Sequence, residues 1–284
     1  MCIRDSFHRI GAEFGAAVEG SDDNTRASFS DSYETKLYRD GELFDVTRSA
    51  SGNYVKPLVF RFTRRRATRT SDVGKHTLLS FFDTAGEDLQ TEEKVHLNTR
   101  YLLSADAIVL LLDPLQMPGA RALVGPDVRL PTKGTALDDP INVLSRVSDL
   151  LRTRPGHKVS SPIDVPLAVA FTKIDTLREH LPAASPLLSE RPRARSEAFD
   201  RQDSRNVHHH MRALLEEWDG GQIDRHLAAN YSKYQYFGLS ALGETPTSDN
   251  KVAPSGIRPH RVADPLLWLF SELSVISATW GGER

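Results

Sequence analysis

The sequence predicts an α/β fold of three layers, in which helices cover both faces of a mostly parallel sheet with one antiparallel edge strand. Three observations lead to this prediction. Short apolar runs typical of buried strands recur along the chain, stretches with apolar residues at helical spacing separate them, and the later strands end at polar clusters. A chain of 284 residues can bury a sizeable core, so we expect one domain with insertions.

The strands fall into two groups. Leu58 to Thr63 alternates between apolar and polar residues, and His76 to Phe82 follows after a polar stretch, so this pair is expected to form an antiparallel hairpin. The other runs are continuous, as expected for central parallel strands: Ala107 to Leu112, Pro166 to Phe171 and Tyr234 to Leu239. Functional loops are expected at the carboxyl ends of the central strands.

Helices are predicted where apolar residues recur at a spacing of three to four. These stretches are Phe7 to Val18, Thr91 to Leu103, Pro140 to Arg152, Ser204 to Trp218 and Pro265 to Ile276. Gly20 is a plausible stop for the first. Two regions rich in proline and arginine lack periodicity, and they predict insertions or mobile loops near residues 114–139 and 176–203.

Composition excludes several classes of protein. With 36 basic and 38 acidic residues the net charge is −2, so nothing indicates a nucleic-acid partner, and the basic run Arg61 to Arg69 is best explained as a solvated hairpin. The longest wholly apolar run, Ala107 to Leu112, is far shorter than the roughly 18 residues of a membrane span. Cys2 is the single cysteine, which indicates a reducing compartment, and a cytoplasmic location is expected.

The first candidate site segment, LLSFFDTAGED, is a strand that ends in Asp83 and continues to Gly86. A carboxylate at the end of a strand can hold Mg²⁺ through water, and a glycine three residues later lets a backbone N–H approach a phosphate closely. An ordinary strand followed by a turn explains the segment equally well when it is taken alone.

The second segment, FTKID, follows the strand that ends at Phe171. Asp175 can accept two hydrogen bonds from the N1–H and the exocyclic amine of guanine, a pair of donors that adenine lacks. Lys173, after Thr172, can lay its aliphatic stem along the base while its ammonium reaches nearby loop carbonyls. Taken alone, the motif TKxD is weak, because these residue types are common after strands.

The third segment, GLSAL, ends the last strand. Ser240 can support Asp175, and the small residues there let a backbone N–H meet the guanine O6. The order of the three segments and their common position at strand ends together indicate a GTP-binding site.

DTAG, TKID and SAL resemble the third, fourth and fifth signature motifs of Ras-like, translation-factor-class P-loop GTPases. DTAGED and the long insertion after Asp113-Pro114 look more particularly like the bacterial double-GTPase group, whose members are thought to act in conflict or signalling systems. The resemblance implies GTP or GDP with Mg²⁺ as cofactors. It also implies roles for particular residues: Asp83 as the metal ligand, Gly86 as the γ-phosphate sensor, Thr172, Lys173 and Asp175 as base readers, and Ser240, Ala241 and Leu242 as the rest of the guanine pocket. For the switch threonine that closes onto Mg²⁺, Thr47 is chosen and Thr25 is the runner-up, although either can be an uncommitted loop threonine.

Two features depart from the pattern. Glu87 stands where Ras-like enzymes commonly place a glutamine that orients water, so slow hydrolysis or a partner that supplies a positive group is expected. No GxxxxGK[ST] motif occurs, and the similar stretch from Gly74 to Thr77 is interpreted as a hairpin turn that enters a strand. Residues 1–6 fit no strand and resemble translated adapter sequence, so we expect a non-native start and a missing first strand and phosphate loop before a GTPase-like domain over 7–284.

The functional hypothesis is a guanine-nucleotide switch whose complete form hydrolyses GTP and signals to an effector or regulator, or to a second GTPase domain. An inactive GTPase-like scaffold is the alternative, which the missing loop and Glu87 favour for this chain, and an adenine-using NTPase is a third possibility that Asp175 argues against.

The consecutive His208 to His210 are expected to lie on different sides of a solvated helix rather than to bind one metal. The tryptophans Trp218, Trp268 and Trp280 are expected to be packing anchors or domain-edge residues.

Overall fold

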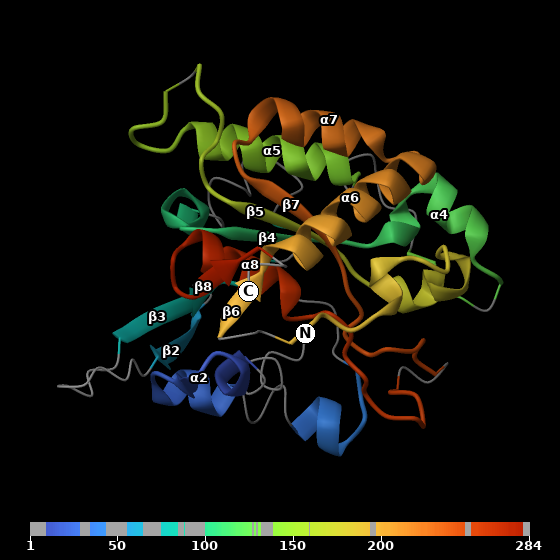
Figure 1. The fold of residues 1–284 in the computed structure, drawn as a ribbon, viewed down its shortest axis with the longest axis horizontal. Coiled ribbons are helices and arrows are strands. Elements are labelled where there is room, and N and C mark those ends of the chain that lie inside the picture. The colour runs from blue at the N-terminus through green and yellow to red at the C-terminus, as the bar shows by residue number, and fades with distance from the viewer. Residues whose placement is uncertain are drawn as a thin grey trace.

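The structure is a computed structural model with an α/β architecture (Figure 1). It describes residues 10–28, 35–43, 56–64, 75–84, 88, 100–126, 128, 130–131, 139–158, 160–193, 197–247 and 251–280. In this part of the chain a parallel sheet lies beneath a layer of helices, and an antiparallel sheet lies to one side of it.

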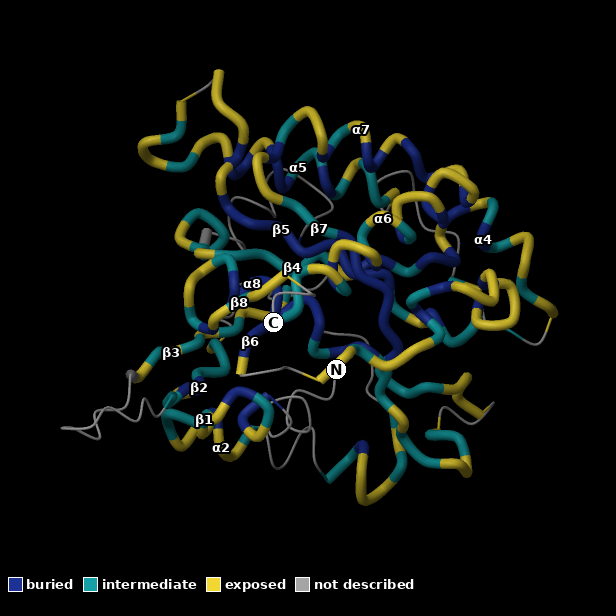
Figure 2. The backbone as a smooth tube through the Cα atoms, viewed as in Figure 1, coloured by how far each residue is buried: buried dark blue, intermediate teal, exposed yellow. Residues whose placement is uncertain are grey.

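The parallel sheet contains β4 (Ile108–Leu112), β5 (Leu167–Phe171) and β7 (Tyr234–Gly238), in the order β4-β5-β7. All three strands were predicted from their apolar runs, and the prediction is confirmed. The central strand, β5, is buried along its whole length, and Figure 2 shows this buried centre beneath more exposed helices and loops. Among the described strands β4 has a hydrogen-bonded neighbour on one side only, and its Leu111 is 50% exposed.

The antiparallel sheet contains β1 (Ala16–Gly20), β2 (Leu58–Arg64) and β3 (Lys75–Phe81), in the order β1-β2-β3. The predicted hairpin of the second and third strands is confirmed, with Phe60 opposite Leu79. Phe60 and Phe62 point to the same side of β2 and are buried, so the alternation in this segment reflects one packed and one open face.

The first strand, β1, replaces part of a predicted helix. Residues 10–13 are helical, but the chain turns at Gly15, whose φ of +58° suits a residue without a side chain, and then enters β1. Ile10 and Phe14 are buried as the helical pattern predicted. Val18 pairs with Phe62 instead of continuing the helix, so the stop at Gly20 was wrong and Gly15 was the missed signal.

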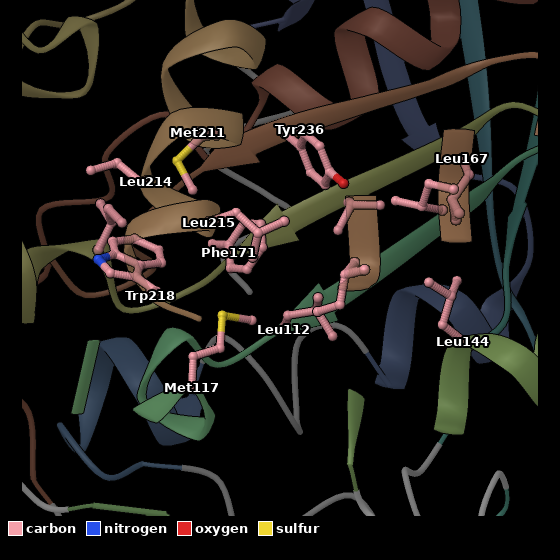
Figure 3. Close-up of a cluster of buried hydrophobic side chains, with 14 of the residues drawn as sticks. Leu112, Met117, Leu144, Leu167, Phe171, Met211, Leu214, Leu215, Trp218 and Tyr236 are labelled. Atoms are coloured by element: carbon pink, nitrogen blue, oxygen red, sulfur yellow. The ribbon is translucent and has the colours of Figure 1, made fainter. Parts of the chain in front are cut away.

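One face of the parallel sheet is covered by α5 (Pro140–Arg152), α6 (Arg201–Glu217) and α7 (Gly221–Asn230), and the opposite face by α8 (Asp264–Glu272). Successive side chains of β5 point to opposite faces of the sheet, which explains the two helical layers. Leu167, Val169 and Phe171 belong to the core beneath α5, α6 and α7. The small Ala168 and Ala170 belong to the core beneath α8. The three-layer prediction is confirmed, and Figure 3 shows the first of these cores around Phe171.

Helix boundaries were predicted with mixed success. The prediction for α5 is confirmed at both ends, α6 begins three residues earlier than expected, and α7 was missed. The last helix ends at Glu272, because Ser274 adopts a positive φ of 57° and the N–H of Val275 returns to the carbonyl of Phe270 at 2.8 Å. The chain then forms β8 (Ser277–Thr279), which pairs in parallel with β6 (Ala198–Asp200).

Both predicted insertions contain short helices. The first holds η4 (Pro114–Gln116) and α4 (Pro118–Leu123), and the second holds η6 (Ile174–His180) and η7 (Pro186–Leu188). Leu115 and Leu187 from these segments are buried in the main core, so the described parts of the insertions are packed onto the domain. Two further short helices are α2 (Asp23–Ser28) and η3 (Arg100–Ser104). Residues 91–99 of a predicted helix lie outside the described residues, and none of the described helices has the length and apolar character needed to cross a membrane.

Candidate functional site

The candidate site lies where β4, β5 and β7 end. Leu112, Phe171 and Gly238 are register partners, so the residues after them meet at one edge of the sheet. The N–H of Thr172 donates to the carbonyl of Leu112 at 2.8 Å, and the N–H of Ile174 donates to the carbonyl of Leu239 at 3.1 Å. These backbone bonds hold the three predicted loops together, as expected for the carboxyl edge of a parallel sheet.

Lys173 has an unusual backbone and an unexpected partner. Its φ of 53° and ψ of 31° place it in the left-handed region, which residues other than glycine adopt at a cost in free energy. Its Nζ lies 2.6 Å from Oδ2 of Asp113 instead of reaching loop carbonyls, so that part of the prediction was wrong. Asp113 also accepts from the N–H of Leu115 and so caps the start of η4. No role was predicted for Asp113, although its position directly after a strand was a signal.

Thr172 and Asp175 behave differently. The hydroxyl of Thr172 donates to the carbonyl of Leu112 at 3.1 Å, so this side chain fastens β5 to β4. Asp175 lies half-buried in the first turn of η6. Within the described part of the chain no group donates a hydrogen bond to its carboxylate. No described residue occupies the carboxylate oxygens of Asp175, and each of them can accept hydrogen bonds from a ligand.

The third loop is built around Ser240, which is buried. Its backbone pairs with His260 through N–H to carbonyl bonds of 2.8 and 3.0 Å, and its Oγ accepts from the N–H of Gly243 at 2.7 Å. No hydrogen bond joins Ser240 to Asp175, so the expected support is not present. Gly243 has a φ of +87°, and a Cβ added there would lie 2.3 Å from the carbonyl oxygen of Arg258. Ala241 and Leu242 complete this turn and are half-buried.

His260 connects this loop to the second insertion, a link that sequence reasoning missed. Its Nε2 lies 2.7 Å from the carbonyl oxygen of Leu187, so this nitrogen donates, and Nδ1 lies 3.4 Å from Glu190. The imidazole of His260 therefore attaches the loop after β7 to η7.

Arg261, the next residue, is the centre of a buried ionic cluster. It donates to Asp203 at 3.0 and 3.2 Å, to Asp264 at 2.7 Å, and to the carbonyls of Pro186 and Ser189 at 3.0 Å each. Every side of the planar guanidinium is engaged, as this fork geometry allows. The cluster joins α6, α8 and the second insertion directly behind the loop of Ser240.

The cluster continues through Arg191, which bonds Glu13 at 2.5 Å and Asp264 at 3.2 Å. Burial raises the pKa of the Asp264 carboxyl, and the charges of Arg261 and Arg191 oppose that rise. A carboxylate so deeply buried depends on both arginines, because an unpaired buried charge is costly.

The predicted metal ligand, Asp83, does not follow a strand of the parallel sheet. It follows β3 in the antiparallel sheet and is exposed, and no hydrogen bond or ion pair joins it to the loops after β4, β5 and β7. Next to it, Thr84 hydrogen-bonds the hydroxyl of Tyr101, whose ring stacks on Phe82 with centroids 4.6 Å apart. Burial raises the pKa of Tyr101, and the nearby carboxylates of Asp88 and Asp83 raise it further.

Three of the predicted residues, Gly86, Glu87 and Thr47, lie outside the described residues. The runner-up Thr25 is fully buried: its hydroxyl accepts from the N–H of Val59 at 2.9 Å and lies 3.0 Å from the Asp22 carboxylate. Thr25 thus attaches α2 to β2.

Other sequence candidates resolve as structural features. The stretch from Gly74 to Thr77, which resembles part of a phosphate-loop motif, was interpreted as a turn that enters a strand. Lys75 begins β3, which agrees with this interpretation, while Gly74 lies outside the described residues. The expectation of a solvated histidine face was wrong in part, because His208 accepts from the N–H of Tyr236 and His210 bonds Ser185 at 2.7 Å. Among the described residues no cluster of His, Cys, Asp and Glu could hold a metal ion.

A family model described as Double-GTPase 2 matches residues 43–219. The chain belongs to the Double-GTPase 2 family. The matched range contains the DTAGED and TKID segments but ends before the loop of Ser240. The predicted likeness to double-GTPases is confirmed, and membership of this family implies guanine-nucleotide binding at the level of the family.

The chain also resembles a curated protein, the putative ESX-1 scaffolding and assembly protein SaeC of Mycolicibacterium smegmatis. The two are 28% identical over 283 residues, which covers 93% of this chain and 68% of SaeC. No solved structure matches the chain.

Proposed function

We propose that this chain binds a guanine nucleotide at the carboxyl edge of β4, β5 and β7. The observation that carries the proposal is the placement of Asp175: its half-buried carboxylate has no hydrogen-bond donor in the described part of the chain and stands at the edge where the TKID and SAL loops meet. A carboxylate in this position matches the paired donors of guanine and leaves adenine without a partner.

Each residue of the base site would have a defined part. Asp175 would accept from the N1–H and amine of guanine, and the stem of Lys173 would lie along the base. Backbone N–H groups of the turn from Ser240 to Leu242 would meet the guanine O6. The hydrogen bonds from this turn to His260 support that role, because they hold the turn in one conformation before a ligand arrives.

Magnesium and hydrolysis belong to the same proposal. Asp83 suits a metal ligand in one respect, since its exposed carboxylate has no hydrogen-bond partner in the described part of the chain. With Thr47 it would hold Mg²⁺, whose charge would offset that of the phosphates. Gly86 would sense the γ-phosphate, and Glu87 would orient water poorly because it is an anion beside a polyanion. Slow turnover of GTP is therefore expected, with the nucleotide state read by an effector or by a second GTPase domain in the cytoplasm.

The proposal is tested by binding of a fluorescent GDP analogue in the presence of Mg²⁺, with GTP, ATP and XTP as competitors. Of the three competitors, only GTP should displace the fluorescent GDP analogue from the unaltered chain. Because the sequence lacks a GxxxxGK[ST] motif, the assay is run in parallel on a chain extended upstream along the reading frame. If the GDP analogue bound to neither of the two chains, the proposal would be refuted.

The decisive variant is Asp175→Asn. An amide places a donor where guanine also has one, so GTP affinity should fall by about 100-fold while XTP gains. Glu179→Gln, on the exposed side of the same short helix, is the matched control and should leave the GTP preference intact. An unchanged GTP preference in Asp175→Asn would remove Asp175 from the base site.

A second candidate function is scaffolding, in which protein contacts matter and turnover does not. The observation that favours it is the likeness to SaeC along 93% of this chain. It would be supported if partner proteins bound equally well with GDP, with GTP and without nucleotide. Binding that depends on GTP would instead favour a switch.

A further inference from the structure

The structure has a cavity that lies apart from the loops of the proposed guanine site. It has a volume of about 280 Å³ and lies at the outer edge of β7, where α6, α8 and the segment after β8 meet. Gln235, which lines it, is the second residue of β7, whereas Ser240 follows the end of that strand. The cavity therefore sits toward the opposite end of the strand from the guanine site.

Hydrogen-bond donors dominate the polar side of this cavity. Arg201 and Arg205 line it from the first two turns of α6, and no carboxylate side chain is among the described residues that line it. Arg201 is held by Glu272 at 2.8 Å, and the same carboxylate lies 3.4 Å from Lys233. No carboxylate pairs with Arg205 in the part of the chain that the structure describes. The charge that the described residues place around the cavity is therefore positive, which favours an anion.

His208 adds a further donor. Its Nδ1 accepts from the backbone N–H of Tyr236 at 3.1 Å, and its ring stacks on that tyrosine, so the neutral imidazole carries its proton on Nε2. Burial lowers the pKa of His208 to about 4, so the ring stays neutral at physiological pH. The side-chain amide of Gln235 donates to Ser204, which fixes the floor of the cavity.

Two indoles form the apolar side. Trp268 of α8 is buried, whereas Trp280 is 45% exposed and has the guanidinium of Arg205 at 5.8 Å from its ring centroid. A guanidinium near an indole holds both groups in place without neutralising the charge. An exposed tryptophan beside an arginine that has no carboxylate partner among the described residues offers a flat surface and a positive charge to the same ligand.

We propose that this cavity binds a small aromatic phosphate monoester, with the phosphate on Arg205 and Arg201 and the ring against Trp280. The volume lies just below the range of about 300–1,000 Å³ that is usual for ligand pockets, so it suits a ligand no larger than one ring and one phosphate. The site is independent of guanine binding, since it shares no residue with the base loops.

The test uses phenyl phosphate, inorganic phosphate and phenol as probes at pH about 7.5, above the second pKa of about 6 of such a monoester. Binding is followed through the indole N–H signals of the three tryptophans by NMR. Phenyl phosphate should shift the signals of Trp280 and Trp268 saturably. Trp218, which is buried in the other core, should not respond. Phenyl phosphate should bind about 10-fold more tightly than inorganic phosphate, because only the first has a ring.

Variants locate the site. Arg205→Gln should weaken phenyl phosphate binding by about 10-fold, and Arg205→Lys should restore part of it. Arg225→Gln, on the exposed face of α7, removes the same charge elsewhere and should change nothing. No saturable shift at Trp280, equal affinity for phenyl phosphate and inorganic phosphate, or full binding by a folded Arg205→Gln would each overturn the proposal. Saturating GDP in a repeat titration should leave the result unchanged, which separates this site from the guanine site.

Discussion

Nζ of Lys173 lies 2.6 Å from Oδ2 of Asp113, although 60 residues separate the two along the chain. The ion pair joins the loop after β5 to the loop after β4, at the edge proposed to bind guanine. It also orients a lysine whose backbone is in the left-handed region. Strained backbone of this kind is often found at functional sites, where surrounding contacts hold it in place.

The strain at Lys173 can be measured with two variants. Lys173→Ala and Lys173→Gly both lose the ion pair with Asp113, so the difference between them reports the backbone alone. Because φ is +53°, glycine should be more stable than alanine by about 1 kcal/mol, the reverse of their usual order. Urea unfolding gives both values, and a more stable alanine variant would show that the left-handed conformation is not strained.

Gly243→Ala should be far more damaging than Gly156→Ala. Both glycines have a φ near +86°, at +87° and +85°, but only at Gly243 would a Cβ meet a backbone atom, the carbonyl oxygen of Arg258 at 2.3 Å. Gly156→Ala, the control, should lower the free energy of unfolding by about 1 kcal/mol through the backbone alone. Gly243→Ala should lower it by at least about 2 kcal/mol. Thermal unfolding of the two variants decides this. Similar losses would mean that the loop of Ser240 can move away without cost.

Arg261→Met should destabilise the fold strongly. The change leaves Asp203 without its arginine and Asp264 with only Arg191, and removing one partner of a buried pair costs about 3 kcal/mol or more. Arg225→Met at the exposed face of α7 is the control and should change stability by less than about 0.5 kcal/mol. If Arg261→Met does not fold, Arg261→Lys provides the measurement, since it keeps the charge but loses the fork. A loss below about 1 kcal/mol in Arg261→Met would mean that water or relaxation satisfies the aspartates.

Stability should fall in mild acid, partly because of His208. Burial lowers its pKa from 6.5 to about 4, so between these values the unfolded chain binds more protons than the folded one. The contribution of His208 is complete above pH 6.5 and is lost as the pH falls toward 4. For a ring that is partly open to solvent, its size is on the order of 2 kcal/mol.

His208→Asn tests this assignment, because the Asn side-chain oxygen can accept the N–H of Tyr236 in place of Nδ1. The loss of stability between pH about 7 and about 4.5 should be smaller in this variant than in the unaltered chain. His180→Asn removes an exposed imidazole from η6 and should retain the original pH dependence. Parallel unfolding curves for all three proteins would place the acid sensitivity in other groups.

Much of the fold follows from local patterns. The parallel strands and α5 were predicted within a residue or so, because a buried strand or an amphipathic helix repeats its signal over several consecutive residues. The strand β1 and helix α7 were missed for a related reason. Ile10, Phe14 and Val18 share a helical spacing that a turn at Gly15 interrupts, and the choice between helix and strand there depends on pairing with β2.

The candidate site likewise has features that local sequence predicts and features that depend on tertiary contacts. The sequence by itself determined which residues could read guanine, because TKID and SAL follow recognisable strands and their side chains have the required donors and acceptors. Only the tertiary structure decided that Lys173 meets Asp113, that His260 fixes the loop of Ser240, and that Arg261 gathers Asp203 and Asp264 behind it. Those contacts join residues far apart along the chain, and their geometry exists only after the sheet has aligned the strand ends and the core has excluded water.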